Sequence, residues 1–404
     1  MSAPSPEPGL DLDDPLEALT VEHLRRRTGK KWSRYGPDVI PAWIADADCG
    51  PPPAARAAIE ELLDRGDLTY PHDDVASWVA DAFAGRMSDR YGWSPDPAGV
   101  VLVTDLVQAV SLVVDHLSEP GDGVAIQTPC YPPFLEEIAA LERQVVPSAW
   151  IRTEQGWEPD LDHLAEFAAR RPGGVVLLVN PHNPTGRAWR RHELEALGEL
   201  VLDHRLVVVS DEIHAELVHD GYEHVPFASL GAELADRTIT LTSTSKSFNL
   251  PGLRTAVMHL GSGGVLEPVR RIRRTQIGTV GNTGIAATLA VWREGDAWLE
   301  AYRLGLARRR EELSGMLAEH LPEIRWVPPE ATSLAWLDCS GLELGRDPGQ
   351  FFLERALVAL SPGPEFGPGG VDHARLNFAT GPAILSEVVE RMVTAVDLFR
   401  ARGR

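Results

Sequence analysis

The chain has few of the residues that build zinc sites, disulfide frameworks or membrane spans. Its three cysteines, Cys49, Cys130 and Cys339, lie far apart and form no CxxC pair. We therefore expect no metal site and no disulfide framework. No run of 18 apolar residues occurs, and residues 1–14 lack the basic start and apolar core of a secretory signal. These deficits predict a cytoplasmic protein with reduced thiols and no membrane span.

Positive charge is also scarce. The 404 residues include 38 Lys plus Arg against 59 Asp plus Glu, which gives a formal net charge of −21. Because such a field repels nucleic acids and anionic membranes, we expect neither as a partner. An apolar content of 44% supports a sizeable core, and the length predicts two domains that pack together.

Lysine is the rarest of the charged residues. Only Lys30, Lys31 and Lys246 occur, and Lys246 lies in a run of serines and threonines, residues 242–247. Arginine stays protonated at any working pH, whereas a desolvated lysine can lose its proton and attack a carbonyl. Nearby hydroxyls and Arg254 can hold a phosphate while the amine forms a Schiff base. The alternative is a surface lysine in a polar loop.

Three short apolar runs, residues 175–179, 206–209 and 238–241, end in polar residues. In open α/β sheets, ligands bind at the carboxyl ends of the strands. The polar residues that follow the first two runs suit a heteroaromatic ligand. Asp211 can pair with a protonated ring nitrogen, Asn183 can hydrogen-bond a phenolate oxygen, and His214 can reach the same oxygen.

These motifs carry a family resemblance. Asn-Pro-x-Asn-Pro-Thr-Gly, then Ser-Asp-Glu, then Ser-x-Ser-Lys resembles the fold-type I pyridoxal-phosphate (PLP) enzymes of the class I/II aminotransferase superfamily. The finer resemblance is to MalY/PatB-type cystathionine β-lyases (cysteine-S-conjugate β-lyases), because His182 and His214 are not generic aminotransferase choices. Nearly the whole chain from about residue 28 takes part, and further matching segments are Lys31–Tyr35, Pro41–Asp48, Pro129–Phe134 and Arg375–Phe378.

The resemblance implies an α/β fold of PLP fold type I, with a mostly parallel central sheet flanked by helices. It implies a large PLP-binding domain of residues 51–285, and a smaller α+β domain formed by residues 1–50 and 286–404. It also implies a homodimer with active sites at the subunit interface. The residue pattern itself predicts an N-terminal arm with a first helix (residues 1–27), further helices over 51–65, 286–319, 351–360 and 383–402, and strands at 335–337 and 374–377.

The resemblance also assigns the cofactor-binding residues. Lys246 would carry the Schiff base to PLP, and its freed amine would remove the substrate's Cα proton. Asp211 would keep the pyridine nitrogen protonated, Asn183 and His214 would flank the phenolic oxygen, and Tyr131 would stack on the ring. Each has an ordinary alternative, such as a capping carboxylate for Asp211, turn chemistry for Asn183, or plain packing for His214 and Tyr131.

The phosphate and the substrate carboxylate have their own expected partners. Arg375 lies in an apolar strand, where the resemblance predicts a fork for the α-carboxylate, assisted by Asn183 and the backbone near Ala45. Surface exposure is the alternative for Arg375. The expected phosphate ligands are side chains, backbone N–H groups at a helix start, and a tyrosine that reaches the partner subunit's phosphate: Ser243, Ser245, Arg254, Leu106, Val107 and Tyr70.

The chain departs from the family pattern at two positions. Asp105 stands where relatives often have Gly or Ser, and a carboxylate there repels a phosphate unless it caps the helix and points away. Ser333 stands where relatives commonly place an aromatic residue, which predicts a wider or more polar pocket, unless the change is neutral.

The leading function is that of a PLP-dependent carbon–sulfur β-lyase. Such an enzyme cleaves an S-substituted L-cysteine, cystathionine-like or a biosynthetic S-conjugate, to thiol, pyruvate and ammonia. The alternative is an aminotransferase, which reprotonates the same carbanion on the cofactor. A PLP-binding regulator is disfavoured because only a short acidic arm, and no basic DNA-binding module, precedes the PLP domain.

Overall fold

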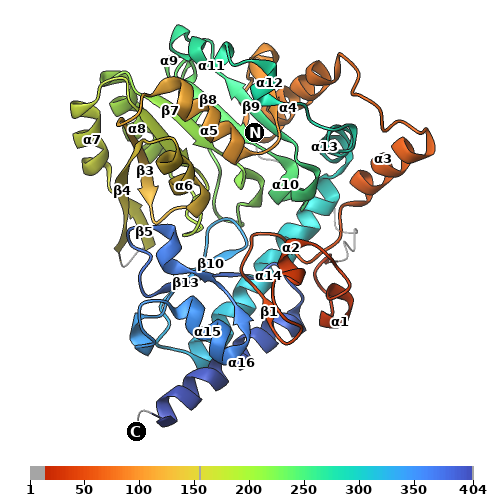
Figure 1. The fold of residues 1–404 in the computed structure, drawn as a ribbon, viewed down its shortest axis with the longest axis vertical. Coiled ribbons are helices and arrows are strands. Elements are labelled where there is room, and N and C mark those ends of the chain that lie inside the picture. The colour runs from red at the N-terminus through yellow and green to blue at the C-terminus, as the bar shows by residue number, and fades with distance from the viewer. Residues whose placement is uncertain (1–13, 154–155, 403–404) are drawn as a thin grey trace.

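An eight-stranded sheet is built from strands between residues 100 and 260. The computed structural model of the chain describes residues 14–153 and 156–402. The strands lie in the order β2-β9-β8-β7-β6-β3-β4-β5 (Figure 1). Their bounds are β2 Val100–Val103, β3 Gly123–Thr128, β4 Gln144–Thr153, β5 Gly156–Pro159, β6 Val175–Val179, β7 Val207–Asp211, β8 Thr238–Thr242 and β9 Ala256–Leu260.

The middle of this sheet is parallel, as expected. Strands β8, β7, β6, β3 and β4 pair in parallel, whereas β2, β9 and β5 join antiparallel at the edges. Strands β6 and β7 are buried at every position, because helices cover both faces. Along β6, Val175, Leu177 and Val179 enter one core, and Val176 and Leu178 enter the other. The fold class predicted from the sequence is confirmed.

Helices form layers on the two faces. One face carries α5 (Leu106–Leu117), α6 (Pro132–Ala140) and α11 (Glu267–Arg270), whose apolar residues share a core with the sheet. The other face carries α7 (Leu161–Arg170), α8 (Arg191–Asp203) and α9 (Ala232–Ala235). Two one-turn helices, α10 (Thr244–Ser247) and α12 (Arg274–Ile277), follow β8 and α11.

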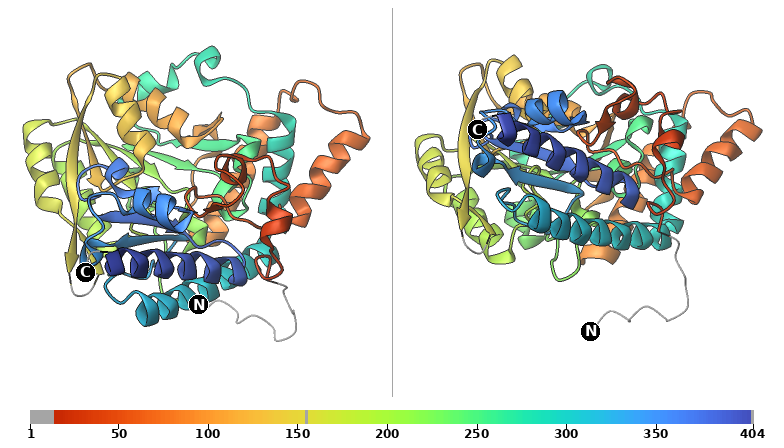
Figure 2. Two further views of the ribbon diagram at one scale, coloured as in Figure 1. Left: turned by 60° about the horizontal axis from the view of Figure 1, so that its bottom comes forward. Right: turned by 90° about the horizontal axis from the view of Figure 1, so that it is seen from below.

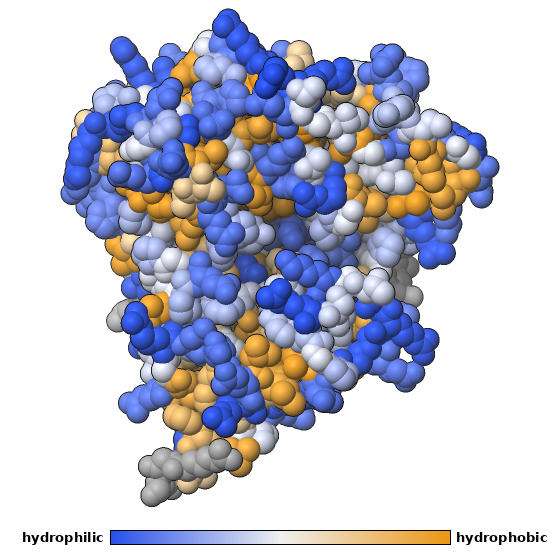
Figure 3. Space-filling view, viewed as in Figure 1, coloured by the Kyte–Doolittle hydropathy of each residue, from blue (hydrophilic) through white to orange (hydrophobic). Residues whose placement is uncertain are grey.

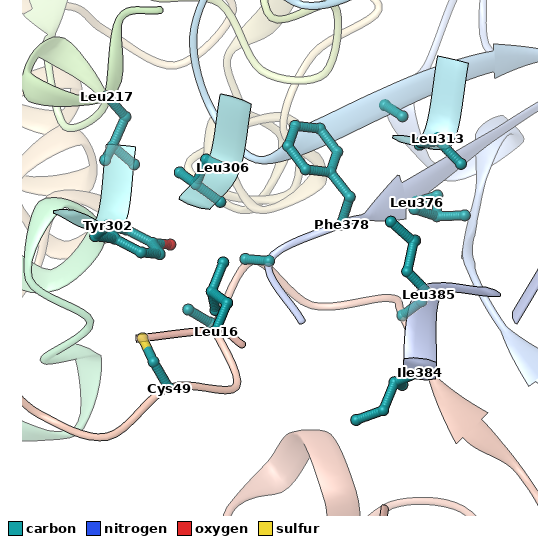
Figure 4. Packing of buried hydrophobic residues seen from close by; sticks show 14 of the residues in the cluster. Leu16, Cys49, Leu217, Tyr302, Leu306, Leu313, Leu376, Phe378, Ile384 and Leu385 are labelled. Carbon is teal, nitrogen blue, oxygen red and sulfur yellow. The ribbon is translucent and has the colours of Figure 1, made fainter. Parts of the chain in front are cut away.

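A third core joins the C-terminal part of the chain to the N-terminal arm. Figure 4 shows Leu16 and Cys49 of the arm near Tyr302 and Leu306. Two long helices, α14 and α16, lie side by side here (Figure 2). The elements of this part are α13 Asn282–Glu294, α14 Asp296–His320, β10 Leu334–Asp338, α15 Pro348–Ala356, β11 Val358–Ala359, β12 Ser361–Pro362, β13 His373–Asn377 and α16 Pro382–Arg402.

The described part of the N-terminal arm is residues 14–50. It contains α1 (Val21–Leu24), α2 (Lys30–Ser33) and β1 (Ile40–Pro41), and β1 pairs in parallel with β11. Residues 1–13 of the predicted arm lie outside the described residues. After the arm come α3 (Pro53–Asp64) and α4 (Val75–Tyr91), which pack against α13.

One helix boundary differs from the sequence expectation. The helix expected over 351–360 is wrong at its C-terminal end, because it stops at Ala356 and Leu357 adopts a left-handed φ of 54°. The residues after it form β11, whose partner β1 lies more than 300 residues earlier, so no local pattern could reveal the strand. The proposed domain boundary at residue 285 falls inside α13 and stays a prediction.

None of the helices in the described ranges combines the length and the apolar character that a membrane crossing requires.

Candidate active site

The candidate site lies where β6, β7 and β8 end. Because these strands are parallel neighbours, their carboxyl ends meet at one edge of the sheet. Asn183 lies in the loop after β6, Asp211 closes β7, and His214 follows it. Lys246 lies on α10, directly after β8. The three polar segments singled out in the sequence therefore converge.

The loop after β6 is a tight turn that presents Asn183. The His182 N–H donates to the Arg187 carbonyl at 2.8 Å, and the Gly186 N–H donates to the His182 carbonyl at 2.8 Å. The His182 ring also bonds the Thr185 hydroxyl at 2.8 Å. Gly186 has a φ of +70°, and a Cβ there would lie 2.3 Å from the Pro329 Cβ. Only glycine fits this turn, which accounts for the last residue of the motif.

Lys246 is half-buried among charged groups. Its Nζ donates to the Ala45 carbonyl at 2.8 Å and lies 3.6 Å from Asp46 Oδ1. Burial lowers the Lys246 pKa, Asp46 partly opposes this effect, and Arg375 adds to it. Such an amine reaches its nucleophilic neutral form more readily than a surface lysine.

Asp211 is a buried carboxylate without a cationic partner. Only 5% of the residue is exposed, and no Lys, Arg or His nitrogen lies within 4.0 Å among the described residues. Its Oδ1 accepts the Ile213 N–H at 3.1 Å. Burial raises the Asp211 pKa to about 7. An uncompensated buried carboxylate is costly, so the site favours a cation beside Asp211.

His214 is a buried neutral base. Burial, together with the positive charges of Lys246 and Arg375, lowers its pKa to about 3. Its Nδ1 is buried and has no hydrogen-bond partner within the described ranges. An unpaired buried nitrogen costs free energy, and a ligand atom that bonds it would remove that cost.

Arg375 is a buried cation without an anion. Its Nη1 donates to Asn183 Oδ1 at 2.8 Å, and its Nη2 donates to the Trp43 carbonyl at 3.0 Å and to Ser361 Oγ at 3.2 Å. The guanidinium lies 4.9 Å from the Phe366 ring centroid. No carboxylate lies within 4.0 Å of it in the part of the chain described, and burial lowers its pKa to about 10. A carboxylate ligand would compensate this charge.

Tyr131 is a partly buried aromatic residue at the start of α6. It directly precedes α6, and its ring meets Phe134 edge-on at 5.4 Å between centroids. Burial raises the Tyr131 pKa, so its hydroxyl stays protonated. Arg375 lowers the Tyr131 pKa, whereas Asp211, Asp46 and Asp105 add to the raising effect of burial.

Asp105 caps α5, and both of its carboxylate oxygens are bonded within the chain. Its Oδ1 accepts the Gln108 N–H at 2.9 Å, and its Oδ2 pairs with Arg254. The expected helix start is therefore present, with Leu106 and Val107 in the first turn. This is the geometry under which a carboxylate at position 105 leaves the backbone N–H groups open to an anion.

Two of the expected phosphate ligands, Ser243 and Arg254, already bond other groups of the chain. Ser243 is the N-cap of α10, where its Oγ donates to the Thr255 carbonyl at 2.7 Å and accepts the Ser245 N–H at 3.1 Å. The Ser243 side chain is therefore already used within the chain. Arg254 is exposed and pairs with Asp105.

Tyr70 lies apart from the cluster within one chain. The residue is 95% exposed, and Leu63 and Leu68 nearby are 55% and 60% exposed. Asn282 Nδ2 fixes the segment by donating to the Thr69 carbonyl at 2.9 Å. Figure 3 shows apolar atoms gathered on the side of the molecule where α3 ends. Among the residues that the structure describes, none covers this surface.

The site thus combines three groups that a ligand could engage. A lysine amine with a lowered pKa can react with a carbonyl, a buried carboxylate needs a cation, and a buried guanidinium needs an anion. A heteroaromatic aldehyde with a protonated ring, together with an amino acid that supplies a carboxylate, satisfies all three.

Comparisons with known proteins agree with the sequence motifs. The model of the family "Aminotransferase class I and II" matches residues 45–393. The chain belongs to this family. A putative cystathionine beta-lyase of Mycobacterium leprae is 35% identical over 96% of this chain and 99% of its own length. Cystathionine beta-lyase PatB of Bacillus subtilis is 32% identical over 91% of this chain and 96% of its own length. PLP-containing cystalysin of Treponema denticola superposes with a TM-score of 0.89 at 27% identity, covering 96% of this chain and 99% of cystalysin.

Lys31 and Trp32 have a structural role in this aminotransferase-family chain that the sequence did not predict. Lys31 Nζ lies 3.0 Å from Asp48 Oδ1, with both side chains buried, and also donates to the Asp46 carbonyl at 3.0 Å. Trp32 Nε1 donates to the same Asp48 oxygen at 2.7 Å. The pair holds residues 43–49, here named the strap, against the site. The scarcity of lysine is the signal that could have pointed to Lys31.

Two asparagines complete the support of the strap. Asn249 accepts the Ala47 N–H at 3.0 Å and donates to the Cys49 carbonyl at 3.0 Å. Asn377 donates to the Ile44 carbonyl at 2.8 Å and to the Asp46 carbonyl at 2.9 Å. Asn249 and Asn377 belong to the matching segments after Lys246 and Arg375, and no pattern in the sequence assigns them this role.

Proposed function

We propose that the chain is a PLP-dependent carbon–sulfur β-lyase, which cleaves an S-substituted L-cysteine to thiol, pyruvate and ammonia. The observation that carries the proposal is the convergence of Lys246, whose pKa is lowered by burial, with a buried Asp211 and a buried Arg375 that have no ion-pair partner among the described residues. Its similarity over nearly full length to proteins named cystathionine beta-lyase supports a lyase over other members of the family.

The residues present fit PLP. Lys246 would hold it covalently, Asp211 would pair with its ring nitrogen, and His214 Nδ1 and Asn183 would face its phenolic oxygen. Tyr131 would lie against the ring. The N–H groups at the start of α5 and the side chains of Ser245 and Arg254 would hold the phosphate, with Ser243 acting mainly as the helix cap. Bound PLP supplies an electron-withdrawing ring that stabilises negative charge on the substrate's Cα.

The chain's own groups then bind and orient the substrate. Arg375 receives the α-carboxylate in a fork, and Asn183 and the Trp43 carbonyl keep the guanidinium in position. The neutral amine of Lys246 removes the proton from Cα. The lowering of the Lys246 pKa by burial favours this role, because only the unprotonated amine can act as the base.

The exposed segment around Tyr70 supports a homodimer. A second copy that covers Leu63 and Leu68 would remove them from water and bring Tyr70 to the partner subunit's phosphate. We also infer a cytoplasmic location and the division into a large domain (residues 51–285) and a small domain with the arm.

A panel of substrates tests the proposed function. Cystathionine and a series of S-substituted L-cysteines are incubated with the PLP-loaded enzyme, and pyruvate and thiol are measured together. A lyase releases the two in equal amounts without any added 2-oxo acid. Turnover that depends on a 2-oxo acid, with the sulfur retained on the carbon skeleton, would instead establish the aminotransferase that the family name allows.

A further inference from the structure

The carboxylate of Asp46 lies beside the reactive amine, and none of the roles assigned to the other residues uses it. Its Oδ1 is 3.6 Å from Lys246 Nζ, and 29% of the side chain is exposed. Among the described residues, the Asp46 carboxylate has no other ion-pair partner. It is therefore a negative charge held next to the point where chemistry takes place.

The backbone of Asp46 is fixed from two sides. Its carbonyl accepts both Lys31 Nζ at 3.0 Å and Asn377 Nδ2 at 2.9 Å. Lys31 is itself paired with buried Asp48. The strap can thus keep the Asp46 carboxylate at one place when Lys246 moves.

The strap touches both the amine and the carboxylate fork. The Trp43 carbonyl accepts Arg375 Nη2 at 3.0 Å, and the Ala45 carbonyl accepts Lys246 Nζ at 2.8 Å. An amino acid carries its carboxylate and its ammonium on one carbon atom. When the carboxylate lies on Arg375, the ammonium lies toward the Ala45–Asp46 end of the strap.

We propose that Asp46 positions the α-ammonium group of the substrate. In the cofactor-free chain, its carboxylate faces the Lys246 ammonium. Once Lys246 is bonded to the cofactor it no longer presents a free ammonium, and the Asp46 carboxylate receives the ammonium of the incoming amino acid instead. This inference rests on the amino-acid substrate of the proposed function and adds a second contact to the one at Arg375.

The first test measures the contact with Lys246 in the cofactor-free protein. The groups that face Lys246 are Asp46, Arg375, Asp211 and His214. An amine-selective acetylating reagent is applied from neutral to alkaline pH, and Lys246 acetylation is quantified by peptide mass spectrometry. Because Asp46→Asn removes an attracting charge, we expect Lys246 to be acetylated about tenfold faster at neutral pH.

Asp38→Asn is the matched control for this measurement. Asp38 is an exposed aspartate on the same arm, and its replacement removes the same charge away from the site. It should leave the acetylation profile of Lys246 unchanged. An Asp46→Asn profile that superposes on the wild-type profile would refute the contact.

The second test measures substrate binding in the PLP-loaded enzyme. The half-saturation concentration of S-methyl-L-cysteine is read from the cofactor's absorbance in a rapid-mixing measurement, before turnover consumes the ligand. For Asp46→Asn it should rise about tenfold, and Asp46→Glu should recover part of the loss. The dissociation constant of 3-(methylthio)propionate, the same ligand without its amine, should not change, because Arg375 still binds the carboxylate.

Two results of the binding test overturn the proposal. An unchanged half-saturation concentration would show that Asp46 does not meet the ammonium. Equal weakening of both ligands would show that the substitution displaced the strap, so that Asp46 is only structural. Failure of the lyase proposal is a separate result, since it is seen as missing pyruvate and thiol while both binding titrations can still be read.

Discussion

Replacing Asp211 with Asn should change how the stability of the cofactor-free protein depends on pH. Burial raises the Asp211 pKa from 3.8 to about 7, so the folded chain holds a proton that the unfolded chain releases. The associated stability is fully present below about pH 4 and is lost as the pH rises through 7. At about 1.4 kcal/mol for each tenfold change in proton affinity, the loss reaches about 4 kcal/mol.

The amide introduced by Asp211→Asn would keep the hydrogen bond to the Ile213 N–H but carry no charge. The free energy of unfolding of cofactor-free wild type and Asp211→Asn is measured by urea denaturation at several pH values between 5 and 8. Between pH 5 and 8 the variant should gain about 2.5 kcal/mol of unfolding free energy relative to the wild type, because the first part of the wild-type loss already occurs below pH 5. Its affinity for PLP should fall, because the ring nitrogen loses its ionic partner.

Asp203→Asn supplies the control, since Asp203 is an exposed aspartate at the end of α8. Its stability should follow the wild-type pH profile. A constant difference between wild type and Asp211→Asn across this pH range would refute the reasoning, because it would show that the Asp211 carboxyl does not titrate there.

Two further substitutions test the substrate fork and the strap. Arg375→Ala should lower kcat/KM for amino-acid substrates, by an amount equivalent to about 2–5 kcal/mol of lost transition-state stabilisation, because it removes a buried charge-paired contact. PLP should stay bound. A near-normal kcat/KM would place the carboxylate site elsewhere. Lys31→Met should lower the free energy of unfolding by about 3–5 kcal/mol, because Asp48 is left buried without its partner. Lys30→Met, at an exposed lysine, is the control in urea denaturation. Equal losses of unfolding free energy for the two variants would contradict a stabilising role of the buried Lys31–Asp48 pair.

The parts of the site that follow a strand could be predicted from the sequence. Asn183 and Lys246 follow short strands and Asp211 closes one, and parallel strands bring these ends together. The helix start at Leu106 could be predicted because Asp105 is a good N-cap. At these positions, the local residue pattern and the arrangement of the sheet predict the same location for the side chain.

The contacts that fix the arm could not be predicted. Lys31, Asn249 and Asn377 hold the strap through backbone carbonyls that lie from 15 to 333 residues away. Such contacts leave no periodic pattern in a single sequence, since a carbonyl is present at every position. For the same reason the sequence predicts a phosphate ligand at Ser243, whereas its hydroxyl caps α10 and bonds Thr255 within the chain.

The most direct test of the central claim counts products against active sites. PLP-loaded enzyme is mixed with excess cystathionine or S-methyl-L-cysteine without any 2-oxo acid, and pyruvate is measured together with the fraction of cofactor converted to its amine form. Elimination at a site built on Lys246 predicts many pyruvates per site while the cofactor keeps its aldehyde oxidation level. One 2-oxo acid per site, followed by arrest with the cofactor in the amine form, would contradict the lyase.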